Sequence, residues 1–579
     1  MDSDQEEETA YLLQKRRDIT KALLHLPYDL IAYIERAEVH TELGYPDLAA
    51  GDSYKALLLC DECANEGFEY HDEALDALRS RSNDGTPIVL REPGTSSVDL
   101  PRGVESMSLN TDAETEADAE RKTLELVRIA SIRCYRSLAI SLLLCGCLKS
   151  AYDFCTRGLA VAPEDVELLQ AKEYIENMAK RRLKVDKVDI TELPDQGLVR
   201  REIYPWNDHE PNRYAQETLD FLNAQLADAA PNVEVRVTEL PTLLESAGTS
   251  VDGSGTLPTN KQLGLFAKVD IQPGDPILNE TSLLVANNRL KESLCDACSL
   301  ELPPLTSESK VVGCPECDDI MFCDEYCLSR AQEEYHPAVC DKDIDTIAKD
   351  PDPREKPFAL YLLLLSRALA MAETQEIHPL DLKEVKYIWG DFLPSMANAV
   401  SLSPNAPPPP VWTLPFSFQY NIAGPLHVLE KMDMDIFSTL ATYDLWILNT
   451  LYSKFRGTAS ARVNKRNGHP EVAAVHPLWC LANHDCNPNV QWEWAGRMKL
   501  WCREKKIGGL PGGIKAGEEV LNHYCDIDLK VQDRREWAQG SLGGWCMCER
   551  CRTEAAEEAK ATTTATNGAG GKHLTNGHS

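Results

Sequence analysis

Regularly spaced cysteines near the middle of the chain constrain its fold more strongly than any other feature of the sequence. Between residues 295 and 340, seven cysteines and one histidine follow one another in four close pairs. Thiolate and imidazole are preferred ligands of zinc, and a tetrahedral ion takes four of them, so eight ligands complete two sites. The ligands are Cys295, Cys298, Cys314, Cys317, Cys323, Cys327, His336 and Cys340. The sequence therefore predicts a small module that folds around two zinc ions.

Composition favours metal ligands over disulfide bonds. The acidic segment Met1–Thr9 lacks the apolar stretch of a secretory signal peptide, so we expect the chain in the nucleus, the cytoplasm or both. In such a reducing compartment, twenty cysteines are typical of metal sites and buried thiols. The longest apolar run, Phe358–Leu365, is too short to span a membrane. The net charge of −33 argues against nucleic acid as the main ligand, and it fits either a cationic protein partner or solubility alone.

Residues 9–182 are predicted to form helical hairpins. In two places a glycine is followed five residues later by an alanine, namely Gly44 with Ala49 and Gly146 with Ala151. A glycine that turns the chain and a small residue that lets paired helices approach are typical of the tetratricopeptide repeat (TPR), which these segments resemble. Any amphipathic helical hairpin would show a similar pattern, so both interpretations stay open.

Three further segments have compositions that do not favour a packed core. Residues 82–119 interrupt the hairpins and are predicted to be a disordered excursion. Residues 183–254 are predicted to connect the N-terminal repeats to the next domain, and residues 554–579 to form a disordered tail. A proline cluster at 404–410 is predicted to be a surface loop.

Three motifs enclose the cysteine module. Before it lies Leu263-Gly264-Leu265-Phe266-Ala267, and far after it come Asn483-His484-Asp485-Cys486-Asn487-Pro488-Asn489 and Gly517-Glu518-Glu519-Val520-Leu521-Asn522-His523-Tyr524. In this order they resemble the SET domain, and the inserted cysteine module resembles the MYND zinc finger. The chain is thus similar to the SET- and MYND-domain protein lysine methyltransferases.

The resemblance implies a multidomain α+β fold. All-α TPR-like repeats would be followed by a β-rich SET domain at residues 255–553. That domain would contain the MYND finger at 295–340, a helical insertion at 341–480 and a post-SET zinc segment at 540–553.

The resemblance also implies how the zinc ligands are grouped. One ion would be held by Cys295, Cys298, Cys323 and Cys327, and a second by Cys314, Cys317, His336 and Cys340. A third would be held by Cys486, Cys546, Cys548 and Cys551, which closes the C-terminal segment over the active site. Three zinc ions are therefore expected, and the two sites within 295–340 are closed, so they would be structural or bind partners.

The expected cofactor is S-adenosylmethionine. By resemblance, Gly264, Leu265, Asn483, His484 and Trp545 would contact it, and Tyr524 would be the catalytic residue at the end of the lysine channel. Two positions depart from the family pattern: Gln262 replaces a glycine of the cofactor loop, and Gly544 replaces an aromatic residue before Cys546.

Two functions follow from these motifs. The first is an S-adenosylmethionine-dependent protein-lysine N-methyltransferase that acts on histone or non-histone lysines and recruits protein partners through its TPR and MYND regions. The second is a weak or inactive SET-scaffold adaptor that binds proteins through the same regions. Retention of Asn483, His484 and Tyr524 favours the enzyme, whereas Gln262 and Gly544 favour the adaptor.

Overall fold

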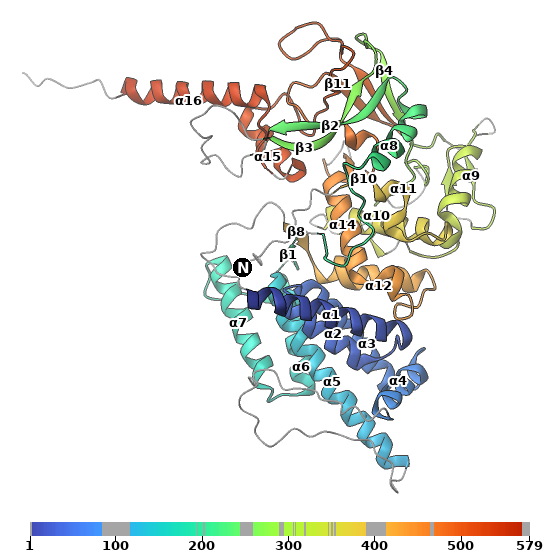
Figure 1. Cartoon of the computed structure of the whole chain (residues 1–579). Coiled ribbons are helices and arrows are strands. Elements are labelled where there is room, and N and C mark those ends of the chain that lie inside the picture. Colours follow the sequence, from blue (N-terminus) through green and yellow to red (C-terminus); the bar gives the residue numbers. More distant parts are fainter. Residues whose placement is uncertain are drawn as a thin grey trace, which may run out of the picture. The chain divides into compact units, whose positions relative to one another are not determined.

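The protein is described by a computed structural model that divides into two compact units (Figure 1). Unit 1 comprises Met1–Tyr204 and Leu393–Thr450, and unit 2 comprises Pro205–Phe392 and Leu451–Ser579. The structure describes all residues except 1–2, 84–115, 194, 201–202, 242, 244–258, 289–293, 305, 307–308, 318–319, 345–346, 349–350, 352–354, 390–412, 464–467, 543 and 570–579. The proline cluster at 404–410 and most of the expected excursion at 82–119 therefore lie outside the described residues.

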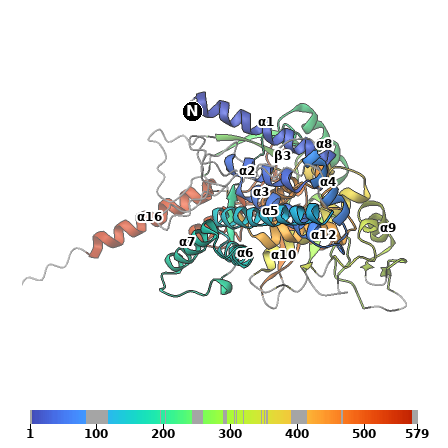
Figure 2. The same cartoon turned by 90° about the horizontal axis from the view of Figure 1, so that it is seen from below.

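Unit 1 is built mainly from helices, most of which pack against a neighbour in the sequence (Figures 1 and 2). Its main helices are α1 (Ser3–His25), α2 (Leu30–Glu42), α3 (Pro46–Ala64), α4 (His71–Asn83), α5 (Glu116–Cys145), α6 (Leu148–Val161), α7 (Val166–Leu183), α12 (Gly424–Lys431) and α13 (Leu440–Tyr443). The predicted helical N-terminal region is confirmed.

The two Gly/Ala pairs occupy equivalent places in two helical hairpins. Gly44 lies between α2 and α3 with φ +78°, and Gly146 lies between α5 and α6 with φ +84°, a backbone region that favours glycine. Ala49 and Ala151 are fully buried where the helices meet. The recurrence thus has the predicted physical basis, while the assignment to the TPR class stays a prediction.

The segment before α14 differs from the expectation of one continuous insertion at 341–480. Residues 413–450 belong to unit 1, where β8 (Thr413–Phe416) pairs antiparallel with β1 (Gly197–Arg200). The fully buried guanidinium of Arg36 binds Asp52 and Asp444. A buried cation requires anionic partners, and Asp444 supplies one of them from this distant segment.

Unit 2 contains short sheets with helices packed around them. Its strands are β2 (Val233–Pro241), β3 (Thr259–Ala267), β4 (Pro276–Glu280), β5 (Val285–Asn287), β6 (Val312–Gly313), β7 (Met321–Phe322), β9 (Ser460–Val463), β10 (Pro470–Ala474), β11 (Val490–Trp494) and β12 (Met498–Cys502). Its helices are α8 (Gln216–Ala229), α9 (Glu325–Glu334), α10 (Lys356–Thr374), α11 (Lys383–Lys386), α15 (Val531–Leu542), α16 (Glu549–Ala569) and the later part of α14 (Leu445–Thr458).

The sheets of unit 2 pair in the orders β2-β3, β11-β12-β4, β5-β10-β9 and β6-β7. Apolar side chains from α8, β2, β3 and β4 share one core, which includes Leu222, Val235, Leu265 and Leu278. The region 183–254, expected only to connect two domains, therefore contributes α8 and β2 to the structural unit that contains β3. This role depends on pairing across sequence distance, which its weak local pattern does not reveal.

Helix α10 is the helix of the described residues whose length and hydropathy would allow it to cross a membrane. It is long and apolar enough to cross a membrane, with a mean hydropathy of 1.2, and 67% of the window is buried inside the structure. Burial of this kind is also the property of a core helix in a globular unit.

At the C-terminus, α16 continues through residues 554–569, for which the composition predicts a disordered tail. Alanine has the highest helix propensity, and this segment contains many alanines, which accounts for the difference. Residues 570–579 lie outside the described part of the chain.

Candidate functional site

Three groups of four cysteine or histidine side chains converge in unit 2. Within each group the ligand atoms lie within 4.8 Å of one another. The groups are Cys295/Cys298/Cys323/Cys327, Cys314/Cys317/His336/Cys340 and Cys486/Cys546/Cys548/Cys551. These are the three sets that the resemblance implied. The cysteine clusters could therefore hold zinc, while the MYND assignment of the first two stays a prediction.

The spacing of the ligand atoms fits tetrahedral zinc. Zinc–sulfur bonds of about 2.3 Å place two thiolates of a tetrahedral site about 3.8 Å apart. The Sγ atoms of Cys298 and Cys323 lie 3.9 Å apart. His336 directs Nε2 to the second group, 3.1 Å from Cys314 Sγ and 3.6 Å from Cys317 Sγ. The donor sets thus fit zinc in both number and type.

Local structure places the ligands of the first group. Cys323 lies just before α9 and Cys327 lies in its first turn, where the N-cap residue Asp324 accepts a hydrogen bond from the backbone N–H of Cys327 at 2.9 Å. Asp is a preferred N-cap residue because it satisfies an otherwise unpaired N–H of the first helical turn. This capped turn brings the two thiolates to 3.4 Å.

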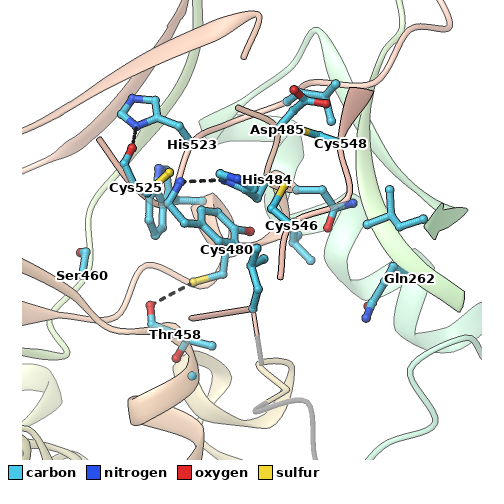
Figure 3. Close-up of a pocket in the computed structure, with 18 of the residues that line it drawn as sticks. Gln262, Thr458, Ser460, Cys480, His484, Asp485, His523, Cys525, Cys546 and Cys548 are labelled. Carbon is cyan, nitrogen blue, oxygen red and sulfur yellow. Dashed lines mark hydrogen bonds between the residues drawn. The ribbon is translucent and has the colours of Figure 1, made fainter. Parts of the chain in front are cut away.

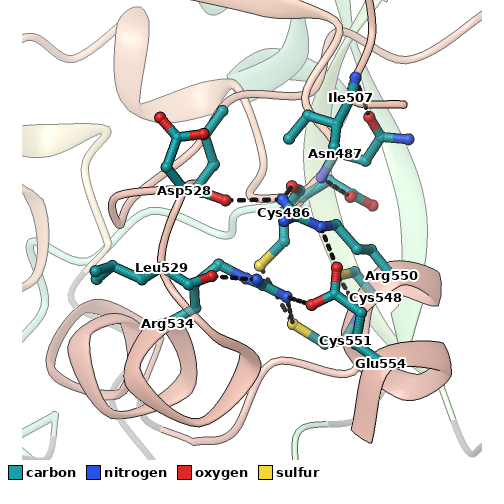
Figure 4. Close-up of polar contacts among 12 residues, drawn as sticks. Cys486, Asn487, Ile507, Asp528, Leu529, Arg534, Cys548, Arg550, Cys551 and Glu554 are labelled. Carbon is teal, nitrogen blue, oxygen red and sulfur yellow. Dashed lines mark hydrogen bonds and ion pairs between the residues drawn. The ribbon is translucent and has the colours of Figure 1, made fainter. Parts of the chain in front are cut away.

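Arginines tie the C-terminal cysteines to the segment that contains Cys486 (Figure 4). Arg550 Nη1 donates to the carbonyl oxygens of Cys486 at 2.7 Å and Ile527 at 2.9 Å. Arg534 is fully buried, and its Nη2 donates to Glu554 at 2.6 Å and faces Cys551 Sγ at 3.7 Å. The start of α16 is therefore held against the asparagine-histidine segment by hydrogen bonds as well as by the proposed metal ligands.

The asparagine-histidine segment crosses the strand-like residues that follow the Gly-Glu-Glu turn. His484 and Asn522 form a parallel bridge, in which Asp485 N–H donates to Asn522 O at 2.8 Å and Asn522 N–H donates to Asn483 O at 2.7 Å. On the other side, Val520 N–H donates to Leu265 O of β3 at 2.7 Å. Residues 519–522 thus run between β3 and the segment 483–485.

Gly264 is required by a close approach at this crossing. A Cβ at this position would overlap Glu519 Oε1 and would lie 3.0 Å from Asn483 Nδ2. Asn483 Nδ2 donates to Glu519 Oε1 at 2.7 Å and to Leu263 O at 2.8 Å. Burial raises the pKa of Glu519, and the hydrogen bond from Asn483 opposes this shift. The glycine predicted to contact the cofactor therefore makes room for the side chains that hold the crossing together.

Tyr524 and His484 form a connected pair beside the crossing. The Tyr524 hydroxyl donates to Ala482 O at 2.9 Å, and the Tyr524 backbone N–H donates to His484 Nδ1 at 3.0 Å. Because Nδ1 accepts this bond, the ring proton lies on Nε2, which faces Cys486 Sγ at 3.3 Å. The His484 ring thus connects the backbone of Tyr524 to Cys486 of the third cysteine group.

A cavity of about 1020 Å³ opens beside this pair (Figure 3). Its volume is in the range of sites that bind cofactors and other small molecules. Asn483, His484 and Tyr524 line it, as do Gln262 and Leu263 of β3. The C-terminal segment adds further lining residues, which are Leu542, Cys546, Met547, Cys548, Glu549 and Arg552.

Three residues expected to contact a cofactor, namely Gly264, Leu265 and Trp545, do not line this cavity. Leu265 is fully buried in the core that β3 shares with α8. Trp545 is also absent from the lining, and the Arg535 guanidinium lies 5.4 Å from the centre of its ring. Trp537 and Met547 line the cavity near this part of the chain instead.

The sequence motifs did not identify several aromatic residues of the cavity wall. Trp479 and Trp492 line it in contact with each other, with ring centres 5.7 Å apart, and Trp479 lies 6.2 Å from Tyr524. Both indole N–H groups are buried without a hydrogen-bond partner among the described residues. His523 lies beside Trp492 at 5.9 Å, and burial lowers its pKa. The tryptophans on both sides of the asparagine-histidine motif in the sequence were the signal that could have indicated an aromatic cavity wall.

Glu280 positions the turn that precedes Asn483. Its carboxylate is buried and accepts hydrogen bonds from the backbone N–H groups of Leu478 at 3.0 Å and Trp479 at 2.9 Å. Burial raises the pKa of Glu280 to about 7, although these two hydrogen bonds oppose the shift. The folded protein therefore holds the proton of Glu280 more tightly than the unfolded chain.

This shift predicts a pH dependence of stability. Because the folded pKa exceeds the unfolded value of 4.5, the contribution of Glu280 falls as pH rises between about 4.5 and 7. Between pH 5.5 and 8, the wild type should lose about 1 to 3 kcal/mol more unfolding free energy than Glu280→Gln. Denaturant unfolding followed by tryptophan fluorescence measures this difference. If the unfolding free energy of both proteins depended on pH in the same way, the raised pKa of Glu280 would be wrong.

The comparisons with known proteins agree with this arrangement. Residues 262–525 match the SET domain family model, and this range begins at Gln262 and ends one residue after Tyr524. Histone-lysine N-methyltransferase SET5 of Yarrowia lipolytica (strain CLIB 122 / E 150) is 22% identical over 438 residues, which cover 71% of this chain and 87% of that protein.

A second similar protein is N-lysine methyltransferase SMYD2 of Homo sapiens. It is 31% identical over 88 residues, which cover 15% of this chain and 19% of that protein. The domain match spans the crossing, the cavity-lining residues of β3 and Tyr524. The chain therefore contains a SET domain at residues 262–525 and is similar to two lysine methyltransferases.

Proposed function

We propose that the chain is an S-adenosylmethionine-dependent protein-lysine N-methyltransferase. The observation that supports this most directly is the position of Tyr524. Its hydroxyl is fixed by Ala482 O, and its backbone is fixed by His484, at the wall of a cavity that is also lined by Asn483. The SET-domain match and the names of both relatives point to the same reaction.

The cavity fits S-adenosylmethionine in size and in the chemistry of its wall. Gly264 keeps the wall open where a Cβ would displace Glu519 and Asn483. Asn483, His484 and residues of the C-terminal segment would hold the cofactor, and Leu265 and Trp545 are replaced in this role by Leu263 and Met547. When bound, the cofactor would supply a methyl group on a positively charged sulfur.

Methyl transfer to lysine forms an N–C bond from the nitrogen lone pair while the C–S bond pair returns to sulfur. The lysine must therefore lose its ammonium proton before the transfer. A wall of Trp479, Trp492 and Tyr524 disfavours the charged amine through desolvation. The Tyr524 hydroxyl, held by Ala482 O, would orient the amine for in-line attack, because alignment is the main requirement of this displacement.

We further propose that the TPR-like helices of unit 1 and the two cysteine groups between Cys295 and Cys340 recruit protein partners or substrate. Closed four-ligand sites leave no open position for chemistry, so these groups suit a structural or binding role. The substrate would be a lysine of a histone or of another protein. With its net charge of −33, the chain would attract basic substrates, in the nucleus, the cytoplasm or both.

An inactive adaptor is the competing function, and the cavity argues against it. The departure at Gln262 leaves the cavity open, since Gln262 lies in its wall and hydrogen-bonds sideways to Arg213. The absence of an aromatic residue at position 544 is offset by Trp537, which lines the cavity from α15. Neither departure fills the site.

Calorimetric titration with S-adenosylmethionine, combined with methylation of a cell extract using a radiolabelled methyl donor, tests the proposal. We expect one binding site and labelled lysines identified by mass spectrometry. A folded, zinc-loaded protein that neither binds the cofactor nor labels any protein would refute the enzyme and leave the adaptor.

A further inference from the structure

The loop before α8 places an arginine at the cavity wall, outside the residues matched by the SET domain. Arg213 Nη1 donates to Gln262 Oε1 at 2.9 Å, and its guanidinium lies 5.0 Å from the centre of the Trp389 ring. Arg213, Gln262 and Trp389 all line the cavity. The next residue, Tyr214, anchors the same loop on β3 by donating to Lys261 O at 2.6 Å. Two consecutive side chains thus fix the loop to the start of β3.

This pairing determines which hydrogen-bonding groups face the ligand. Arginine has five N–H donors and no acceptor, and glutamine has one carbonyl oxygen and two N–H donors. The bond from Arg213 engages the glutamine oxygen, so the glutamine contributes its N–H donors beside the positive charge of the guanidinium. Such a pair suits a carboxylate, which a guanidinium binds with charge-assisted hydrogen bonds.

The other arginines of the cavity wall lie on different elements. The Arg456 guanidinium lies 4.8 Å from the centre of the Tyr361 ring, and Arg552 belongs to α16. Arg503 follows β12, and its Nε donates to Lys505 O at 3.4 Å. Arg213 instead contacts β3 two residues before Gly264, where Asn483 and Glu519 meet the strand. It is therefore joined to the part of the wall that the glycine keeps open.

We propose that Arg213 and Gln262 form the subsite for the α-carboxylate of S-adenosylmethionine. The inference rests on the proposed function. The cofactor has an adenosine part, a sulfonium and an amino-acid end, and only the amino-acid end carries a negative charge. A desolvated carboxylate needs a cation, and Arg213 supplies one that is already held in place by Gln262 and Trp389. The glutamine that departs from the family pattern then has a binding role.

Binding of two ligands to two proteins tests this subsite. Decarboxylated S-adenosylmethionine keeps the sulfonium and the amine and lacks only the carboxylate. By calorimetry, the wild type should bind S-adenosylmethionine roughly 10- to 100-fold more tightly than the decarboxylated ligand. Arg213→Gln should reduce this preference to about threefold or less, while its affinity for the decarboxylated ligand stays within about threefold of wild type. Arg213→Lys should restore part of the preference, since it keeps the charge but loses the planar donor pair.

The matched control is Arg236→Gln on β2. Arg236 pairs with Glu234 and lies over the Phe266 ring, away from the cavity lining, so this variant should keep the wild-type preference. Unchanged preference in Arg213→Gln, or equal weakening of both ligands, would overturn the carboxylate subsite while the cofactor site stands. A wild type that binds neither ligand would overturn the proposed function itself, and the subsite with it.

Discussion

Replacing Tyr524 by phenylalanine is expected to lower kcat by roughly 10²- to 10³-fold while cofactor affinity changes by less than about twofold. The substitution removes the hydroxyl that donates to Ala482 O and leaves the ring beside Trp479 and His484. The backbone N–H of residue 524 still donates to His484 Nδ1, so the crossing keeps its geometry. Single-turnover methylation with saturating cofactor, together with calorimetric binding, separates the chemical step from binding.

Tyr361→Phe is the matched control for this variant. Tyr361 lies on α10, where its ring packs edge-on against Tyr452, and it does not line the cavity. The same hydroxyl deletion there should leave kcat within about twofold of wild type. If Tyr524→Phe lost cofactor affinity in proportion to its turnover, the hydroxyl would serve binding, and its proposed role in orienting the amine would be wrong.

Elemental analysis of the purified chain should find three zinc ions per molecule, and Cys551→Ser should reduce this to two. Cys551 is fully buried, and its Sγ lies 3.3 Å from Cys486 Sγ. Losing this ligand would loosen the segment that contributes Cys546 and Met547 to the cavity wall. Because structural zinc contributes on the order of 10 kcal/mol to the folding of its site, we expect cofactor affinity to fall at least tenfold.

Cys314→Ser provides the contrast within the same chain. It removes a ligand of the second group, which does not line the cavity, so zinc should fall to two while cofactor affinity stays near the wild-type value. Removing all zinc with a chelator should lower the melting temperature and abolish cofactor binding. Two zinc ions in the wild type, with Cys551→Ser unchanged, would show that the C-terminal cysteines do not form a metal site.

Much of the candidate site could be predicted from short sequence segments. Zinc ligands have narrow requirements for atom type and spacing, so the pairs within 295–340 predicted two zinc sites, and the resemblance to the family implied how their ligands are grouped. Gly44 and Gly146 were predictable as turns because the left-handed backbone region strongly favours glycine. In each case a local chemical requirement leaves few alternative residues.

Other parts of the site depend on long-range packing. Arg213 has no motif around it, and its place in the cavity wall follows from the anchoring of its loop on β3. Leu265 and Trp545 were expected at the cofactor, and the place of each side chain in the folded chain removes it from the wall. Leu263 and Leu265 share one face of β3, so only the packing along that strand separates the cavity residue from the core residue.

The cysteine array thus determined by sequence alone that the chain contains two clusters suited to zinc, because the ligands and their spacing are encoded locally. The motifs around Gly264, Asn483 and Tyr524 indicated the SET domain. The resemblance to the SET family also predicted that Cys486 joins cysteines about 60 residues later, and the structure brings these side chains together. Only the tertiary structure decided that residues 413–450 belong with the helical unit and that Arg213 reaches the cavity. The reason is that buried charges, thiolates and the backbone groups of strand edges must be paired, and their partners can lie far away in the sequence.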